Sequence, residues 1–487
     1  MIYSRLLKPS LFIILLLFIY SIWQRVPDID DAWIGEHAFW LSEVGYVKSE
    51  LMHGITLQEE RHLVHHKFFT LNGLIAIKLF GFSLYTLKSV TLLWTALFMI
   101  LFYIYLRKKK GSTTALFGIL LIAVNAFIFQ YSFVYRPEIM VMTLGFGSFV
   151  FLEKYITQNR TVFVIISGFI AGIAASAHLN GLIYIGAGYL LLLWKKKVSG
   201  SIILGLVSLL GFAVYFYDFT ADYNMNFWLH QIKDSPALHK SSVIPESIGF
   251  FLKVLREHMR FFHSPKEIVF SALLIGSIIV NFKQLKNETI YLHYLLLLVI
   301  LLSLISVHTT SKYLLLYLPF MMLIIVKSFN LMYNKVTDET QIPTKQRKQW
   351  LAMIIIITCY LAIHMVYNVL ISVEKFDSAQ HKKYTQKYFP SHDNTAILAP
   401  MSFIFNELHH YKRIQSDLSI EEMNRPHTLT SETFFETIDS LDLNAMILTD
   451  EYQRKYGLYI LDENDLRSKG FTILGKEHGM TFYSKIE

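Results

Sequence analysis

Long apolar runs recur along this chain and limit most strongly what it can fold into. About eleven of them approach or reach the roughly 20 residues that a helix needs to cross the hydrocarbon core of a bilayer. Of the 487 residues, 53% are hydrophobic and only 17% are charged, which is not the composition of an ordinary soluble globular protein. The predicted spans lie near residues 9–24, 87–106, 113–134, 138–153, 161–177, 181–194, 200–217, 267–282, 290–307, 313–327 and 350–371.

Lysine and arginine collect in alternate connectors between these spans. Clusters at residues 107–110 and 195–197 fall on one side, whereas the short connectors on the other side hold only Arg136 and Lys312. Because cytoplasmic loops carry such an excess, the pattern predicts a cytoplasmic N-terminus and an extracytoplasmic C-terminus. The net charge of +8 comes largely from these connectors, so nucleic-acid binding is not predicted. The first span lacks a small-residue cleavage pattern and is predicted to be an uncleaved helix.

This orientation places three long segments outside the membrane, namely residues 25–86, 218–266 and 372–487. In the first segment, apolar residues at helical spacing from 31 to 47 predict an amphipathic helix on the membrane surface, and residues 68–82 predict a second interfacial helix.

The tail alternates short strand-like runs with polar helical stretches, and residues 471–486 indicate a hairpin. The predicted architecture is therefore a multi-pass α-helical membrane domain (residues 1–371) followed by a small extracytoplasmic α/β domain (residues 372–487).

An acidic pair, Asp30 and Asp31, follows the first span directly. A carboxylate at this level can take a proton from an acceptor hydroxyl, although charges beside a span also simply mark the interface. With cations nearby, such a site suits a lipid-anchored substrate whose anionic phosphate must be neutralised as it leaves. The other polar residues predicted at the same outer level are His65, His66, Lys67, Arg136, Glu138, His178, Arg256, Arg260, His308, Lys312 and Tyr313.

Taken singly, these residues have simpler explanations. Arg136 and Lys312 could bind ordinary phospholipid head groups, and His178 could be a hydrogen-bonded helix end. Arg256 and Arg260, four residues apart, could form a solvated helix face.

No cofactor is indicated by the residue pattern. The adjacent His65 and His66 would point in different directions from a helix, so a divalent cation is an open alternative without a clear ligand set. The single cysteine, Cys359, lies inside a predicted span, which leaves neither a disulfide nor a thiolate metal site.

From Ser10 to Tyr317, the order of these elements resembles the glycosyltransferase C superfamily. The branch that it resembles most contains bacterial lipid A aminoarabinose transferases and protein O-mannosyltransferases. By this resemblance Asp30, the first acid after the first span, is the expected catalytic base and Asp31 its supporting neighbour.

The resemblance extends to later elements. Lys67 matches a lysine that the aminoarabinose branch uses near the lipid phosphate, although Phe68 and Phe69 stand where the family has a proline pair. Arg136 and Glu138 match an arginine-plus-acid element whose acid is commonly aspartate. His178 lies in a glycine-rich span and turn, and Lys312-Tyr313 resembles a late basic-aromatic element.

The resemblance implies an inverting glycosyltransferase in the bacterial inner membrane. Its expected partners are membrane lipids, a polyprenyl-phosphate-linked sugar donor and a glycan, lipid or protein acceptor at the outer face. Two alternatives stay open from the residues. A transporter or flippase of lipid-linked glycans would carry charges within its spans, and a membrane acyl- or phosphotransferase would depend on His65, His66, His178 or His308 rather than on Asp30.

Overall fold

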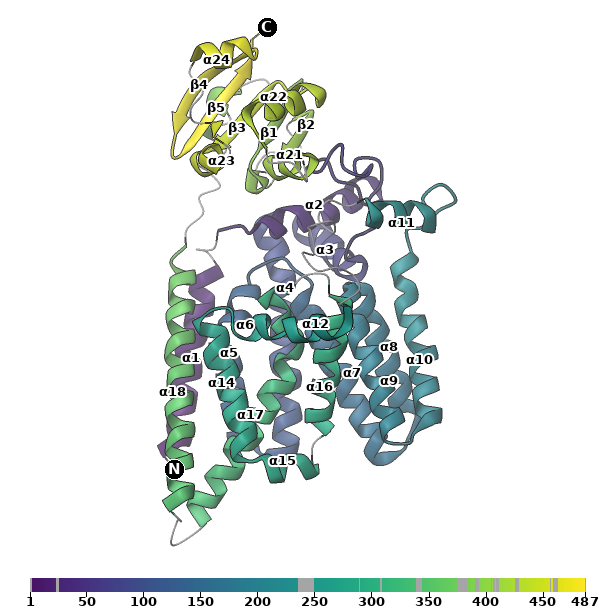
Figure 1. Cartoon of the computed structure of the whole chain (residues 1–487), viewed down its shortest axis with the longest axis vertical. Coiled ribbons are helices and arrows are strands. Elements are labelled where there is room, and N and C mark those ends of the chain that lie inside the picture. The colour runs from purple at the N-terminus through teal and green to yellow at the C-terminus, as the bar shows by residue number, and fades with distance from the viewer. Residues whose placement is uncertain are drawn as a thin grey trace.

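A bundle of membrane-type helices carries a small sheet domain at one end (Figure 1). Within the described residues of this computed structural model, five helices are long and apolar enough to cross a membrane, and a sixth span results if the bent pair 252–261 and 265–280 counts as one. The structure describes residues 2–22, 26–234, 249–288, 290–306, 309–338, 344–374, 383–384, 386–389, 394–403, 405, 408, 411–424, 429–455, 457–458 and 463–486.

The multi-pass helical fold predicted from the apolar runs is confirmed, and each predicted span coincides with helical structure. The total of eleven spans stays a prediction, because several of these helices are shorter than 18 residues. The bundle consists of α1 (Ile2–Ile22), α4 (Leu84–Lys110), α5 (Ser112–Val124), α6 (Ala126–Tyr131), α7 (Glu138–Gln158), α8 (Thr161–Ala177), α9 (Leu182–Trp194), α10 (Val198–Phe212), α14 (Pro265–Val280), α16 (Ile290–Ile305), α17 (Leu314–Asp338) and α18 (Thr344–Ser372).

The prediction of one continuous span over residues 113–134 was wrong, because the helix breaks at Asn125. The side chain of Asn125 accepts from the backbone N–H groups of Phe127 and Ile128 and so caps α6. His364 of α18 accepts from the next free backbone donor, Ala126 N, at 2.8 Å. Polar side chains thus satisfy the backbone groups that a broken helix leaves open inside the bundle.

Close packing of α8 against α10 depends on glycine. A Cβ added at Gly172 would lie 2.1 Å from the carbonyl oxygen of Ser208, and one added at Gly211 would lie 2.4 Å from that of Phe169. Small residues allow two helix backbones to approach in this way inside a membrane. The glycine-rich span therefore builds the scaffold that ends at His178.

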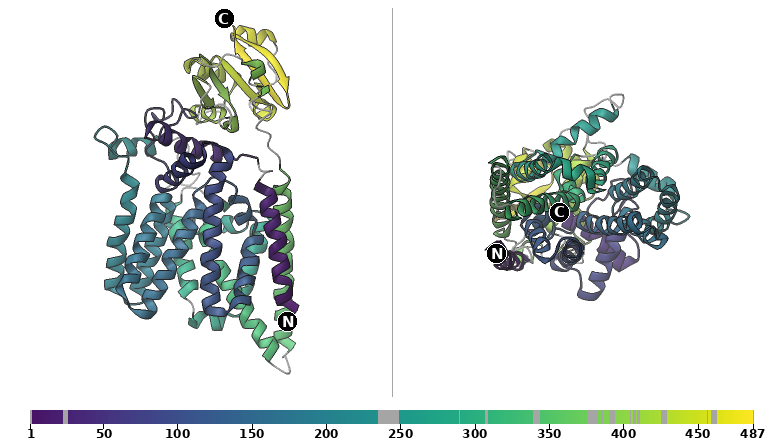
Figure 2. Two further views of the ribbon diagram at one scale, coloured as in Figure 1. Left: turned by 180° about the vertical axis from the view of Figure 1, so that it is seen from behind. Right: turned by 90° about the horizontal axis from the view of Figure 1, so that it is seen from below.

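Two short helices, α2 (Ile29–Val44) and α3 (Lys67–Phe80), lie across one end of the bundle (Figures 1 and 2). We call this end the α2 end, and we call the opposite end, which carries α15 (Phe282–Glu288), the α15 end. The second loop adds α11 (Met225–Lys233), α12 (Gly249–Arg256) and α13 (His258–Phe261) to the α2 end. Residues 235–248 of that loop lie outside the described residues.

The predicted helix exists as α2, and its place on a membrane surface stays a prediction. Ile34 and Ala38 belong to the core of the bundle, whereas Ala32 and Phe39 belong to a second core shared with the C-terminal sheet. The structure thus buries α2 on two faces, which the sequence pattern did not predict. The helix at residues 68–82 is confirmed as α3.

The C-terminal residues form a five-stranded sheet in the order β2-β1-β3-β5-β4. The three strands β1, β2 and β3 are parallel, and β4 and β5 form the predicted hairpin, whose turn contains His478 and Gly479 with positive φ. The strands are β1 (Ala396–Ala399), β2 (Arg413–Ser416), β3 (Ala445–Thr449), β4 (Phe471–Glu477) and β5 (Met480–Lys485), and the helices around them are α21 (Asp417–Met423), α22 (Ser431–Ser440), α23 (Asp450–Lys455) and α24 (Glu463–Ser468). The sequence did not single out β2, and the domain boundary at residue 372 stays a prediction.

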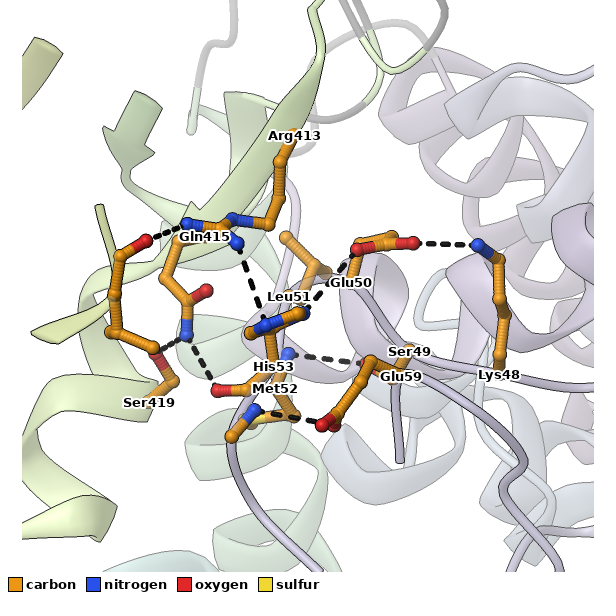
Figure 3. Close-up of polar contacts among 12 residues, drawn as sticks. Lys48, Ser49, Glu50, Leu51, Met52, His53, Glu59, Arg413, Gln415 and Ser419 are labelled. Atoms are coloured by element: carbon orange, nitrogen blue, oxygen red, sulfur yellow. Dashed lines mark hydrogen bonds and ion pairs between the residues drawn. The ribbon is translucent and has the colours of Figure 1, made fainter. Parts of the chain in front are cut away.

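The loop between α2 and α3 holds the sheet domain in place (Figure 3). The backbone N–H of Ser416 donates to the carbonyl of Leu51 at 3.1 Å, and the side chain of Gln415 donates to the carbonyl of His53 at 3.0 Å. The ring Nε2 of His53 lies 3.4 Å from the guanidinium of Arg413. Because these contacts join β2 to the loop after α2, we expect the sheet domain and α2 to be ordered together.

We expect Gln415→Ala to weaken this attachment. The change removes the donor to His53 O and also the 2.6 Å bond to Ser419, so a loss of about 1–3 kcal/mol is expected from buried groups left unpaired. Hydrogen exchange at residues 49–53 should accelerate relative to the wild-type protein. Gln158→Ala, at an exposed position, is the matched control, and equal exchange in both variants would contradict the assigned attachment.

Candidate active site

The acidic pair begins α2, and the two carboxylates face different surroundings. The side chain of Asp28 caps the helix by accepting from the N–H of Asp30 at 3.0 Å, and Asp31 returns a bond by accepting from the N–H of Asp28 at 2.8 Å. This capping box fixes the side chains of Asp28 and Asp31, whereas the side chain of Asp30 stays outside it. The side chain of Asp30 keeps 24% of its surface exposed, whereas Asp31 is fully buried.

Asp31 joins α2 to the loop before α7. Its second oxygen accepts from the backbone N–H of Tyr135, and Lys88 of α4 is close enough to act on its charge. Burial raises the pKa of Asp31 to about 6, and Lys88 and the backbone donors oppose that shift. Both carboxylate oxygens are therefore occupied by backbone donors, which is the arrangement of a positioning residue.

Arg136 lies between two carboxylates. Its Nε and Nη2 atoms donate to Glu138, with the shortest contact at 2.7 Å, and its Nη1 atom pairs with Asp30. Arg136 and Glu138 are almost fully buried, whereas Asp30 is not. One edge of the guanidinium, formed by Nε and Nη2, is thus held by Glu138, and Nη1 points at the partly exposed acid.

Four further residues predicted at this level gather beside Arg136 and Glu138. His66, immediately before α3, stacks on His178 with ring centroids 4.7 Å apart, and His178 meets the ring of Tyr313 at 5.9 Å. Lys312, which is half-buried, is close enough to influence the charge of both histidines. We call the set Asp30, Asp31, His66, Arg136, Glu138, His178, Lys312 and Tyr313 the acidic-pair site.

Both histidines of this site are held neutral at pH 7. Burial lowers the pKa of His66 to about 4 and that of His178 to about 3, against the opposing charge of Glu138. His178 also accepts from the backbone N–H of Asn180 at 3.0 Å and so ends the turn after α8. The cations of the acidic-pair site are therefore Arg136 and Lys312.

Lys67 and His65 form a separate cluster. The ammonium of Lys67 lies 2.7 Å and 2.8 Å from the two oxygens of Asp218, and His65 Nε2 donates to the same carboxylate at 2.9 Å. All three side chains are at most 3% exposed. Burial lowers the pKa of Lys67 to about 8, while Asp218 opposes this shift. Lys67, expected from the family resemblance to approach a lipid phosphate, thus has a buried partner within the chain.

The two arginines of the second loop also separate. Arg260 is fully buried, with its guanidinium 2.7 Å from Glu257, 2.8 Å from the carbonyl of Thr310 and over the ring of Tyr313. Through its contact with the ring of Tyr313, Arg260 packs against the acidic-pair site. Arg256 is half-buried at the end of α12 and forms no ion pair within the described part of the chain. His308 lies outside the described residues.

Two residues with clear roles were not singled out as site residues by the sequence. Asp218 was not predicted as a site residue, because it lies at the edge of a predicted span, 151 residues from Lys67. Glu36 was also not predicted as a site residue, yet its buried carboxylate accepts four hydrogen bonds, from Trp40, Ser49, Glu50 and Leu51. Such long-range pairings leave no local signal in a single sequence.

No group of three or more histidine, cysteine or carboxylate side chains is arranged to hold a metal ion among the residues that the structure describes.

Comparisons with known proteins agree with the multi-pass helical fold described above. Residues 73–217 match the family model of dolichyl-phosphate-mannose-protein mannosyltransferases. No curated protein sequence matches the chain. The solved structure of ArnT from Cupriavidus metallidurans in the apo state superposes with a TM-score of 0.59 at 9% identity, covering 99% of this chain and 98% of that one.

Residues 73–217 thus resemble this mannosyltransferase family, and the fold of the whole chain is similar to that of ArnT. ArnT from the same organism bound to undecaprenyl phosphate gives the same TM-score, 0.59, at 10% identity. The oligosaccharyltransferase of Archaeoglobus fulgidus tethered to an acceptor peptide also gives 0.59 at 11% identity, over 98% of this chain and 74% of that one. The similarity of fold therefore extends over nearly all of this chain.

We expect Lys67→Met to destabilise the protein strongly. The change leaves Asp218 buried without its cation, which typically costs about 3–5 kcal/mol, and Asp218→Leu combined with it should recover most of the thermal stability in detergent. If the pair is structural, the double variant should unfold close to the wild-type temperature. A double variant as unstable as Lys67→Met would contradict a structural role for this pair.

The neutral histidines predict a pH effect on stability. Because the pKa of His66 is about 4 in the folded protein and about 6.5 in an unfolded chain, the unfolded state binds the proton first. The free energy of unfolding should therefore decrease as pH falls from about 6.5 to 4, by up to about 3 kcal/mol for this residue.

His66→Phe keeps the stacking on His178 but cannot bind a proton, so thermal unfolding from pH 7 to pH 4 should show a shallower decrease in stability. His258→Phe, at an exposed position, is the control for the replacement of a histidine by a phenylalanine. An unchanged slope in His66→Phe would show that His66 is not a buried neutral base.

Proposed function

We propose that this chain is an integral-membrane glycosyltransferase that takes its sugar from a polyprenyl-phosphate-linked donor. The observation that carries the proposal is the partly exposed Asp30 beside the buried pair Arg136–Glu138. One group can accept a proton and the other can bind an anion, and they lie side by side at the end of the bundle where a lipid phosphate would reach water. The superfamily fold supports the same class of reaction.

In the proposed reaction, an acceptor hydroxyl loses its proton to Asp30 as its oxygen attacks the anomeric carbon of the sugar. The bond from that carbon to the donor phosphate breaks, and the configuration inverts. The departing lipid phosphate carries the developing negative charge, which needs a fixed cation more than a proton. Arg136 Nη1 and Lys312 are the cations placed to supply it.

The shared guanidinium suggests how donor and base are coupled. Glu138 holds Arg136 through Nε and Nη2, and Nη1, which contacts the partly exposed Asp30, is the donor placed to exchange partners. A donor phosphate that binds Nη1 would take over the cation that Asp30 contacts in the structure, and this raises the basicity of Asp30 when the donor is bound. Asp31 would keep Asp30 in position beside Arg136, since Asp31 joins α2 to the backbone of Tyr135.

The remaining assignments belong to the same proposal. The site would face the extracytoplasmic side of a bacterial inner membrane, with the N-terminus in the cytoplasm, as the basic connectors predict. The acceptor would be a glycan, lipid or protein, and the sheet domain above α2 would border the space from which it enters. The neutral His66 and His178 are suited to hydrogen-bond sugar or acceptor hydroxyls.

The test compares cells that lack the gene with cells that carry wild-type or variant copies. Asp30→Asn should lower sugar transfer by roughly 10²- to 10⁴-fold, the usual loss on removing a general base, while Arg136 keeps its pair with Glu138. Lipid and glycan mass spectrometry should then show accumulated polyprenyl-phosphate sugar and a product that lacks one residue.

Asp222→Asn, an amide replacement of an exposed acid near the same end, should restore the wild-type glycan. Full transfer by Asp30→Asn would exclude Asp30 as the base. If His66→Phe abolished transfer while Asp30→Asn did not, the histidine-dependent transferase would be favoured, and loss of lipid-linked glycan export without loss of transfer would favour the flippase.

A further inference from the structure

The sheet domain contains a cavity of its own, separate from the acidic-pair site. It lies between the β4–β5 hairpin and the helices α23 and α24 (Figure 1). Its volume is about 520 Å³, which is within the usual range of small-molecule sites. Its lining shares no residue with the acidic-pair site, so the proposed transfer does not account for it.

The register of the hairpin directs side chains from both strands into this cavity. Thr481 and Tyr483 are two residues apart on β5 and share a face. Lys476 of β4 pairs with Thr481, and directly opposed residues also share a face. Ile473 pairs with Tyr483, although three residues separate it from Lys476 and regular alternation would place the two on opposite faces. A register shift between Ile473 and Gly475 removes this conflict, so a β-bulge points Lys476 into the cavity.

The floor of the cavity is a buried polar layer. Tyr483 donates to Gln453 Oε1 at 2.9 Å, and Gln453 Nε2 donates to Thr481 Oγ1 at 3.1 Å. All three residues are at most 6% exposed. Because a hydroxyl oxygen has two lone pairs, the oxygens of Thr481 and Tyr483 keep the capacity to accept further hydrogen bonds. The floor therefore suits a ligand that brings its own hydroxyl donors.

The rim of the cavity carries two cations and one carboxylate, namely Arg454, Lys476 and Asp450. Arg454 Nε donates to the backbone carbonyl of Asp450 at 3.2 Å, which leaves the terminal nitrogens of the guanidinium for a ligand. The N–H of Asp450 donates to the carbonyl of Gly479 at 2.8 Å and so fastens α23 to the hairpin turn. Within the described part of the chain, none of the three charged side chains forms an ion pair.

This lining selects for a ligand that has several hydroxyl groups and a negative charge. A neutral sugar would leave both cations unused, and free phosphate would leave the hydroxyl acceptors of the floor without donors. The apolar part of the lining, Leu458, Leu466 and Ile473, can pack against the C–H groups of a sugar ring. A sugar that carries a carboxylate or a phosphate fits all three parts.

We propose that this cavity binds an anionic sugar of the acceptor glycan, with Arg454 and Lys476 as the cations that hold its carboxylate or phosphate. Asp450, Thr481 and Tyr483 would accept from its hydroxyl groups. The sheet domain lies at the α2 end, as the acidic-pair site does (Figure 1), so a glycan held here stays near the end of the bundle where transfer is proposed. The assignment of this sugar to the acceptor rests on the proposed function, whereas its binding does not.

The test is saturation-transfer NMR of the full chain in a detergent without a sugar head group, with glucuronate, glucose 6-phosphate and glucose as probes. At least one anionic sugar should bind the wild-type protein, and glucose should bind roughly tenfold more weakly because it lacks the charge. The double variant Arg454→Gln/Lys476→Gln should bind the anionic sugar weaker by a similar factor. Both positions are exposed, so the domain should still fold.

The matched control is Arg467→Gln/Lys469→Gln, because both residues are exposed in the same domain but lie outside the cavity lining. This variant should bind the anionic sugar as the wild-type protein does. Binding of glucuronate alone would identify a sugar acid, and binding of glucose 6-phosphate alone would identify a sugar phosphate. Either result supports the proposal.

Equal binding in all variants, or an equal loss in the control variant, would overturn the proposal. Glucose that binds as tightly as the anionic sugars would do the same. Displacement of the sugar by an equal concentration of inorganic phosphate or of a glutamate tetrapeptide would assign the cavity to free phosphate or to an acidic peptide instead. No donor lipid is present in this measurement, so full transfer by Asp30→Asn would reject the proposed base and leave the binding result unchanged.

Discussion

The ion pair between Arg136 and Glu138 is the interaction on which the site depends. An arginine buried at this depth needs a carboxylate that occupies its donors, and Glu138 occupies the Nε and Nη2 donors. Nη1 is left for Asp30, so the pair that makes the buried charge tolerable also places Nη1 where the proposed donor phosphate would bind. Asp31 adds the backbone connection from α2 to Tyr135, which keeps the acid and the cation in register.

The second constraint is that α2 is buried on two faces. One face belongs to the core of the bundle and the other to the core of the sheet domain. Glu36, one and a half turns after Asp30, accepts from Ser49, Glu50 and Leu51, and Leu51 in turn accepts from Ser416 of the sheet domain. A continuous set of hydrogen bonds therefore runs from the helix that carries the acid to β2, and the C-terminal domain helps to define the position of Asp30.

Much of this arrangement was predictable from local patterns. Apolar runs located the helices, the strand-like runs near residues 396, 445 and 471 became β1, β3 and β4, and the hairpin lies where glycine allows a tight turn. The grouping of Asp30, Arg136, Glu138, His178 and Lys312 followed from topology, because spans of similar length return the chain to the same level. The break at Asn125 was missed, since one of the groups that satisfy it is a histidine more than 200 residues away.

By itself, the sequence determined that this is a membrane protein of many helices, and it indicated the end of the bundle at which the polar residues collect. Hydrophobicity and the spacing of charges act locally, so they can be seen in a linear chain. Only the tertiary structure decided which polar residue meets which. In the folded chain, Lys67 and His65 pair with Asp218. Arg136 pairs with both Glu138 and Asp30, and α2 is enclosed between two hydrophobic cores. Partner choice among buried charges depends on distances between segments that are far apart in sequence, and those distances exist only in the folded chain.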